Sequence, residues 1–403
     1  METNREAAFI ASRRSFLKSA GAGGLTAALS LGSVRKALAA RMRPRIPAQL
    51  LANAFSADLP ESACHLPPVR VAADREIRTV AGLRPFRPSG FRVELEKFGT
   101  TTVVHNYGHG GGGITLSWGT SRLALDLGLQ GHTGPVAVLG SGAVGLATAR
   151  LLQEAGIPVT VYTKALPPDT TSNIAGGQWF PASVYDPQRT LTPEFTGQFQ
   201  AAARYSYRRY QIMTGSKYGI RWMRNYFPSK EPFRFPTTGG QFSLLQGLLP
   251  ELRDLTPQEH PFVNMPYVRQ FDGLLIEPPV YLPAVLDEVR LAGGKVVVGE
   301  VQNTDQMRKL PEKLVFNCTG LGAKALFGDA ELTPVRGQLA FLLPQPEVTY
   351  ATTYEDTYMF SRRDGILLGG SHEAGDWSLD SDMETKIAVL AKQKELFDGM
   401  RSC

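Results

Sequence analysis

Hydrophobic and polar positions change their period within residues 135–163, PVAVLGSGAVGLATARLLQEAGIPVTVYT. The apolar run 136–139 predicts a short buried strand, and the spacing of apolar residues over 143–155 predicts a helix that ends at Gly156. A second buried strand is expected over 158–163. The order strand, glycine turn, helix, strand is typical of the unit that binds dinucleotides in open parallel sheets.

The glycine turn has the spacing G-x-G-x-x-G, with glycines at 140, 142 and 145. Gly140 allows the tight turn, Gly142 lets the backbone approach a pyrophosphate, and Gly145 lets helix and strand pack closely. The pyrophosphate would lie at the helix N-terminus, against Ala143 and Val144. The alternative is a purely structural strand–helix–strand unit, and the complete context favours dinucleotide binding.

Lys164 follows the second strand, where an acidic residue usually holds a ribose hydroxyl. A lysine there suits the 2′-phosphate of NADP, or it is a solvated side chain beside FAD. This position alone leaves the cofactor undecided.

A second glycine-rich segment precedes the first, in residues 105–119, HNYGHGGGGITLSWG. The four glycines 110–113 have no Cβ, so their backbone can lie flat against a planar ligand. The apolar run 114–129 predicts a helix whose free N–H groups would favour negative charge on that ligand. The alternative is a flexible loop, which Trp118 and the helical pattern argue against.

Two further segments hold candidates for binding a substrate. Arg84 lies in GLRPFRPSGFR, where prolines stiffen the chain, and a fixed guanidinium can clamp a carboxylate through two hydrogen bonds. Tyr354 and Tyr358 would share one face if their segment is a strand. Surface arginines and core packing of the two rings are the alternatives.

The first residues resemble an export signal. SRRSFLK, residues 12–18, is similar to the twin-arginine motif; a weakly apolar stretch and an A-x-A pattern at 37–39 follow it. We therefore expect a signal peptide over 1–39, recognition by the twin-arginine export machinery, a periplasmic or otherwise exported protein, and an irregular spacer over 40–69.

Charge and cysteine content exclude other classes of protein. The net charge is +6, but six basic and two acidic residues lie within 1–39, which leaves +2 for the rest. That balance gives no reason to propose nucleic acid as a partner. Three cysteines without a CxxC pair predict neither a disulfide scaffold nor a metal site.

Together these segments resemble the FAD-dependent D-amino-acid oxidases, which include the D-aspartate oxidases. Besides the blocks already quoted, TTSNIAGGQWFP (170–181), LVFNCTG (314–320), VRGQ and LGGSHEAGDW resemble blocks of that family. The resemblance covers nearly all of residues 70–400. It implies an α/β fold with a Rossmann-type FAD-binding domain (100–185 and 306–330) and a mixed or antiparallel-sheet substrate domain (70–99, 186–305 and 331–403).

The order of the blocks differs from the family's order. There, the G-x-G-x-x-G unit opens the chain, and the blocks similar to residues 70–130 come last. The resemblance therefore implies a circular permutant, in which residues 131–134 join the old termini and new termini open between about residues 400 and 70. Permutation requires the new ends to be at the surface and close together.

The resemblance also assigns roles to residues. Arg84 matches the arginine that binds the substrate carboxylate, Tyr358 a tyrosine that assists it, and Tyr354 a tyrosine that covers the site. Gly111 matches the glycine whose carbonyl accepts from the substrate amine. Further positions match flavin-contacting backbone or the second flavin turn: Gly110, Gly113, Ile114, Thr115, Thr170, Thr171, Ser172, Gly177 and Gln178. Lys164 departs from the family's acidic residue.

The implied activity is oxidation of a D-amino acid by FAD, with hydride transfer from Cα to flavin N5 and release of a 2-oxo acid and ammonia. Oxygen would be the electron acceptor and yield peroxide. The alternatives are a dehydrogenase that uses a quinone and a binding protein with a degenerate flavin site. Which D-amino acid reacts and the oligomeric state stay open.

Two further hypotheses concern His372 and the pair of cysteines at the chain ends. His372 stands where relatives specific for acidic D-amino acids carry an arginine, which implies acceptance of polar or acidic substrates; the alternative is a surface histidine. Cys64 and Cys403 lie at the two new ends, so a disulfide would tie those ends together. The alternative is that both thiols are free, with Cys318 an inert core thiol.

Overall fold

The structure, a computed structural model, describes residues 63–189 and 191–401. The expected signal peptide and nearly all of the expected spacer lie outside the described residues, as does Cys403. Within the described part of the chain, none of the helices has both the length and the apolar character needed to cross a membrane.

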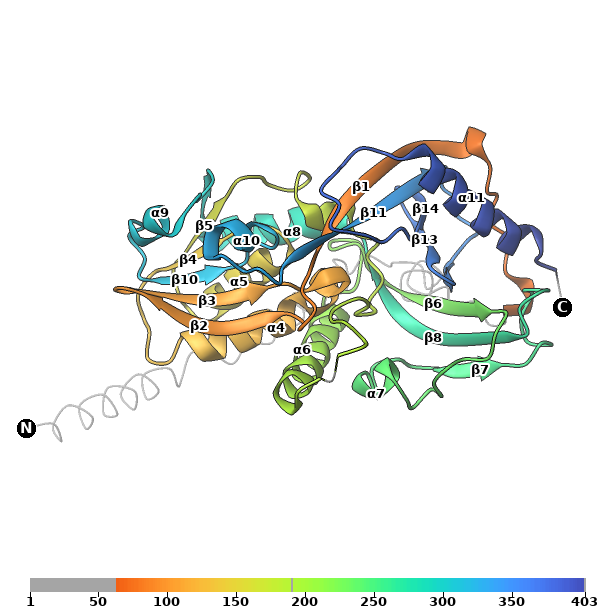
Figure 1. Ribbon diagram of the computed structural model, residues 1–403, viewed down its shortest axis with the longest axis horizontal. Helices are drawn as coiled ribbons and strands as arrows, with labels where there is room; N and C mark the ends of the chain where they lie inside the picture. Colours follow the sequence, from red (N-terminus) through yellow and green to blue (C-terminus); the bar gives the residue numbers. More distant parts are fainter. Residues whose placement is uncertain (1–62, 190, 402–403) are drawn as a thin grey trace, which may run out of the picture. The chain divides into compact units, whose positions relative to one another are not determined.

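Short runs of β-branched and apolar residues form one of the two sheets in the described residues (Figure 1). Five of its strands are parallel, and β2 is antiparallel at one edge. In spatial order the strands are β2 (Arg92–Phe98), β3 (Thr101–Tyr107), β10 (Leu314–Asn317), β4 (Val136–Leu139), β5 (Val159–Thr163) and β9 (Lys295–Val298).

Helices cover both faces of this sheet, which is the arrangement that parallel strands require. Apolar residues of one face, such as Val138 and Phe316, pack against α4 (Gly113–Gly128), α5 (Ala143–Glu154) and α8 (Pro278–Leu291). Those of the other face pack against α9 (Thr304–Arg308) and α10 (Gly322–Phe327). The strand–turn–helix–strand prediction for 135–163 and the helix predicted after the four glycines are confirmed.

The second sheet is mixed and mostly antiparallel. Strands β12 and β6 are its parallel pair. In order it contains β1 (Glu76–Phe86), β11 (Thr333–Leu342), β14 (Gly365–Gly369), β13 (Thr357–Arg362), β12 (Tyr350–Tyr354), β6 (Ile220–Ser229), β8 (Tyr267–Ile276) and β7 (Arg253–Leu255), with β15 (Glu373–Ala374) on β11. The α/β fold class, with one Rossmann-type and one mixed sheet, is confirmed.

The remaining helices join or cover these layers. Helix α6 (Pro193–Ile212) packs on α4 and is capped by the Thr192 hydroxyl, which accepts from the N–H of Phe195. Helix α11 (Met383–Asp398) covers one face of the mixed sheet. Helix α7 (Gln241–Leu244) is a single turn, and 3-10 turns η1 to η4 occupy Ala63–His65, Ala73–Arg75, Gly110–Gly112 and Thr171–Ile174.

The sheets differ from the expected domain ranges in two strands. β2 and β9 belong to the sheet of the dinucleotide unit, although the ranges 70–99 and 186–305 were expected in the other domain. β2 belongs to this sheet because it forms an antiparallel hairpin with β3. The valine run of β9 pairs in parallel with β5 and so adds one more strand at the edge of the sheet.

The described end of the expected spacer has no regular secondary structure beyond the turn Ala63–His65, yet it is packed against the rest of the protein. Leu66 and Val69 are buried in the cluster that lies under α11, and the hydroxyl of Tyr350 donates to the carbonyl of Pro67 at 2.7 Å. Cys64 carries a disulfide bond. Cys318 is free and buried, and burial raises the pKa of its thiol to about 12, as expected of an inert core cysteine.

Candidate functional site

The glycine turn between β4 and α5 has the geometry that its spacing predicts. Gly140 has φ +101°, a left-handed conformation that favours glycine. An added Cβ at Gly145 would overlap the carbonyl of Gly140, so only glycine lets helix and strand pack this closely. The turn therefore places the first residues of α5 at the carboxyl end of β4.

The N-terminus of α5 is open to an anion. Its N-cap residue, Gly142, has no side chain to cap the helix, and the first turn holds no acidic residue. The N–H of Ala143 donates to the hydroxyl of Ser172 at 3.0 Å. A helix N-terminus with a partial positive charge and no acidic residue in its first turn fits the diphosphate of a dinucleotide.

The segment 170–178, which the resemblance predicts to be a second flavin turn, reaches this helix from one side and the mixed sheet from the other. Ser172 lies in the 3-10 turn η4 beside Gly142. The Thr170 hydroxyl donates a hydrogen bond to the side-chain carbonyl of Asn173 at 2.8 Å. Farther on, the carbonyl of Gly177 accepts from Ile276, and the Gln178 amide donates to Asn225 at 2.7 Å. Thr171 is exposed at the start of the turn.

The first two glycines of η3 are required by a close backbone approach, and the third, Gly112, by the side chain of Val184. A Cβ at Gly111 would lie 2.7 Å from the Ala182 carbonyl oxygen, and one at Gly110 would overlap that of Ser183. The N–H of Gly111 donates to Ser183 at 3.2 Å. Ile114 and Thr115 follow in the buried first turn of α4, whereas a Cβ at Gly113 would meet little. Contact of this loop with a planar ligand stays a prediction.

Arg84 lies on β1 with its side chain over β11. Its guanidinium donates to the carbonyls of Ser371 at 3.1 Å and Arg336 at 3.3 Å, and it covers Gly337 so closely that a Cβ there would overlap it. Within the described residues no carboxylate is paired with Arg84, whereas the nearby Arg87 is paired with Asp329. Arg84 is thus a partly buried cation held by neutral groups.

Tyr358 lies on the same face of this sheet. In register, Leu339 of β11 pairs with Gly369, which pairs with Tyr358. A Cβ added at Gly369 would lie 2.6 Å from the Tyr358 ring, so the glycine leaves room for that ring. The ring stacks on Phe360. Ile174 of η4 packs into the same cluster and over Gly82 of β1. The structure therefore brings Arg84, Tyr358 and the second flavin turn to one face.

Tyr354 does not share that face. The segment is a hairpin, in which β12 ends at Tyr354 and β13 begins at Thr357. Tyr354 is buried in the cluster under α11, on the opposite side from Tyr358. The expectation of one strand with both rings on one face is wrong, because a two-residue turn separates them. The hairpin gives no support to the role of Tyr354 as a cover of the site.

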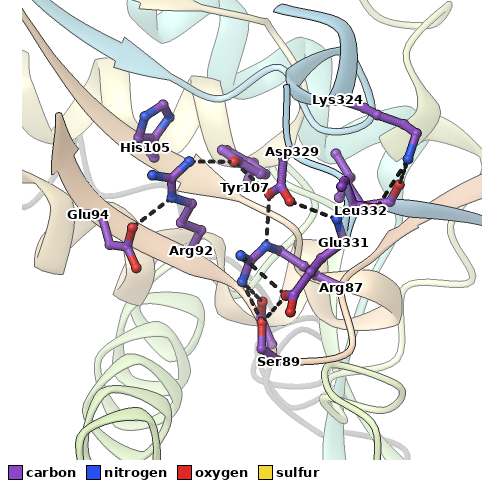
Figure 2. A network of polar contacts seen from close by, with 12 residues as sticks. Arg87, Ser89, Arg92, Glu94, His105, Tyr107, Lys324, Asp329, Glu331 and Leu332 are labelled. Carbon is purple, nitrogen blue, oxygen red and sulfur yellow. Dashed lines mark hydrogen bonds and ion pairs between the residues drawn. The ribbon is translucent and has the colours of Figure 1, made fainter. Parts of the chain in front are cut away.

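A polar network that the sequence did not reveal holds the end of β1 (Figure 2). Arg87 donates to Asp329 at 2.8 Å, and the hydroxyl of Tyr107 donates to the same carboxylate at 2.8 Å. Burial raises the pKa of Asp329, but the bonds from Tyr107 and Arg87 outweigh it and hold that pKa below the usual value. The network ties β1, β3 and the turn after α10 together beside Arg84.

His372 lies beside Ser183 and next to Ser371, whose carbonyl accepts from Arg84. Its ring nitrogen Nε2 is 3.4 Å from the Ser183 hydroxyl, next to the carbonyl that receives Gly111. Surrounding protein and the positive charge of Arg84 lower the pKa of His372, although its side chain is partly open to solvent. Because it follows Ser371, His372 lies beside the candidate carboxylate site.

At the ribose position, Lys164 is exposed and pairs with Glu300 at 3.8 Å. Among the residues that the structure describes, no group of three or more His, Cys, Asp or Glu side chains is arranged to hold a metal ion. The site consists of a glycine turn, an open helix end, a tyrosine, and an arginine that has no carboxylate partner in the described residues, which is chemistry suited to an organic dinucleotide and a small carboxylate.

Comparison with known proteins identifies the class as flavin-dependent oxidoreductases. The sequence model described as FAD dependent oxidoreductase matches residues 135–402, about two thirds of the chain, and the protein belongs to that family. It is thus an enzyme, and its cofactor is FAD. The NADP alternative that Lys164 left open is not supported.

Curated relatives are distant. A D-amino acid oxidase of Dugesia ryukyuensis is 25% identical over 66% of this chain and 79% of its own length. A D-amino-acid oxidase of Rubrobacter xylanophilus is 27% identical over 66% and 77%, and a human D-aspartate oxidase is 27% identical over 64% and 75%. Among solved structures, a glycine oxidase from Bacillus cereus covers 66% of this chain and 78% of its own, at 15% identity and a TM-score of 0.49.

Proposed function

We propose that the protein is a D-amino-acid oxidase. The observation that carries this proposal is Arg84, a partly buried guanidinium with neutral partners and no carboxylate in the described residues, on one sheet face with Tyr358 and the turn Thr171–Ile174. A planar guanidinium held in this way is matched to a carboxylate ligand. The names of the curated relatives support an amino-acid substrate.

FAD, when bound, supplies the two-electron acceptor for the reaction. Its diphosphate would be held by Gly142 and the first N–H groups of α5, and its backbone contacts would come from the segments around Gly111 and Ser172. These residues fit the group because the N-cap residue Gly142 has no side chain and the first turn of α5 holds no acidic residue.

The protein's own contribution is orientation of the substrate. Arg84 binds the carboxylate, the Tyr358 hydroxyl donates to it, and the carbonyl of Gly111 accepts from the uncharged amine. These three contacts decide which hydrogen of Cα can leave as hydride. The amine becomes an imine, which water hydrolyses to a 2-oxo acid and ammonia, and oxygen takes up the two electrons and two protons as hydrogen peroxide.

The test is anaerobic mixing of the holoprotein with a panel of D- and L-amino acids. We expect loss of the visible flavin absorbance with D-enantiomers and none with L-enantiomers. Equal rates for both enantiomers, or none for either, would overturn the proposal, and the second result would favour a binding protein. Admission of air should then yield one peroxide per 2-oxo acid; product without peroxide, dependent on added quinone, would identify a dehydrogenase.

We also propose export through the twin-arginine machinery, which the motif at residues 12–18 supports. Lysine at both Arg13 and Arg14 should retain the enzyme, with its FAD, in the cytoplasm of the producing cell. An unchanged distribution between cytoplasm and periplasm on fractionation would refute it.

Circular permutation is proposed on two grounds. The family match begins at residue 135, and the strands before it complete both sheets, with β1 beside β11 and β3 beside β10. A chain rearranged to begin at Gly134, with residue 401 joined to residue 63 and residue 131 as its end, should fold and bind FAD. Failure to bind FAD in several linker lengths would argue against it.

A further inference from the structure

The carboxyl ends of β5 and β9 bring two opposite charges to the ribose position of the cofactor site. The strands are parallel neighbours, and the N–H of Gly299, just after β9, donates to the carbonyl of Thr163, the last residue of β5, at 2.8 Å. The next residues of each strand end, Lys164 and Glu300, pair at 3.8 Å between Nζ and Oε1.

This arrangement answers a question that Lys164 raises. In a dinucleotide site of this type, an acidic residue at the end of the second strand accepts hydrogen bonds from the ribose hydroxyls. A lysine ammonium has three donors and no acceptor, so it cannot take that role. The carboxylate of Glu300 supplies the missing acceptor from the adjacent strand, at the same edge of the sheet.

We propose that Glu300 is the residue that binds the ribose hydroxyls of the adenosine half of FAD, with Lys164 as its positioning partner. The proposal rests on the FAD site described above. Lys164 has a second effect: its positive charge offsets the repulsion between the Glu300 carboxylate and the FAD diphosphate. The pair also works against a 2′-phosphate, because Glu300 repels a third anionic group.

Exposure of the pair agrees with a ligand site. The side chains of Lys164 and Glu300 are 73% and 55% exposed, so neither is committed to the core. Asp287 and Arg290 on α8 provide a matched comparison, since they form an exposed pair at 3.5 Å on the helix that precedes β9. An exposed ion pair of this kind contributes little to stability, so removing either acid should leave the fold intact.

The experiment measures cofactor affinity of the full-length deflavinated chain, without an amino acid. FAD is compared with an analogue whose adenosine is 2′,3′-dideoxyadenosine. We expect the unsubstituted protein to bind FAD about tenfold to about a hundredfold more tightly than the analogue, as for a hydrogen bond to a charged group. Glu300→Ala should lose that preference while its affinity for the analogue stays within about twofold.

Two further variants make the result decisive. Asp287→Ala should keep the full preference for FAD, and Lys164→Asp added to Glu300→Ala should restore it by returning a carboxylate to β5. The proposal is overturned if Glu300→Ala weakens both ligands equally, if it weakens neither, or if the double variant fails to recover. Because no amino acid is present, a failure of D-amino-acid oxidation would leave this outcome unaffected.

Discussion

Replacing Arg84 by alanine removes the group to which we assign the substrate carboxylate. Loss of one partner from a hydrogen-bonded charge pair costs about 2 to 5 kcal/mol, or about 30-fold to about 4000-fold in kcat/KM. Arg84 is only partly buried, so solvent screens part of the interaction, and we expect the lower half of that range. The kcat/KM of Arg84→Lys should fall between those of the unsubstituted enzyme and Arg84→Ala, because an ammonium keeps the charge but cannot make the bidentate contact.

A loss of stability must be separated from this effect. The Arg84 guanidinium donates to Ser371 at 3.1 Å and Arg336 at 3.3 Å, and such bonds are worth about 1 kcal/mol each. Arg84→Ala should therefore lower the free energy of unfolding by about 1 to 2 kcal/mol, while FAD content stays normal.

A second variant perturbs the same contact without removing the charge. Gly337 lies under the guanidinium, and a Cβ there would overlap it. Gly337→Ala should displace Arg84 and raise KM while the arginine remains. The contact is repulsive and local, so folding and FAD binding should persist.

The assay is the anaerobic rate of flavin reduction as a function of D-amino acid concentration, which separates binding from the chemical step. We expect a rise in the half-saturating concentration for both variants and a slower limiting rate for Arg84→Ala. The reasoning is refuted if both variants match the unsubstituted enzyme within about twofold in kcat/KM, a difference below about 0.5 kcal/mol.

Three other predictions follow. Because burial and the charge of Arg84 lower the pKa of His372, the histidine gains its charge only below about pH 6.5. In the unsubstituted enzyme the ratio of D-aspartate to D-alanine turnover should therefore rise as the pH falls from about 6.5 toward about 4.5, and His372→Ala should remove that rise. The same ratio profile in both proteins would make His372 a surface residue. Burial lowers the pKa of His109 to about 3, so between about pH 6.5 and about pH 3 the unfolded state binds a proton that the folded state does not. The free energy of unfolding should therefore fall as the pH drops through this range, by up to about 1.4 kcal/mol per pH unit. Denaturant titrations at several pH values should show that the free energy of unfolding of His109→Gln depends less on pH. Denatured, unreduced protein from the periplasm should present one titratable thiol, that of Cys318, if Cys64 pairs with Cys403; three thiols would contradict that pairing.

Local patterns predicted the dinucleotide unit well. The switch of period over 135–163 defines β4, α5 and β5 almost to the residue because both strands are buried on two faces and the helix on one. The glycine spacing also predicted the turn between them, because positions 140 and 145 accept no residue with a Cβ without strain or overlap. These features depend on neighbours in the chain, so a single sequence reveals them.

Features that depend on distant residues could not be predicted in this way. The hairpin between Tyr354 and Tyr358 has no turn signature, because its left-handed residue is Glu355 with φ +53° rather than glycine or asparagine. The need for glycine at 110 and 111 comes from the approach of the backbone of residues 182 and 183, and at 112 from the approach of the Val184 side chain. Asp329 binds Arg87 across 242 positions, and no local pattern indicates such a partner.

The crossing between the two sheets contains the contacts that position Arg84. β1 ends at Phe86 in the mixed sheet, and β2 begins at Arg92 in the parallel sheet. Arg87, just after β1, and Tyr107, at the end of β3, meet at Asp329, while an isolated bridge joins Phe86 to His109. The position of Arg84 relative to the glycine loop is thus set by contacts within this crossing and its partners. The circular permutation proposed above would break the chain outside this crossing, so we expect the rearranged chain to keep these contacts and with them the geometry that would bind a carboxylate.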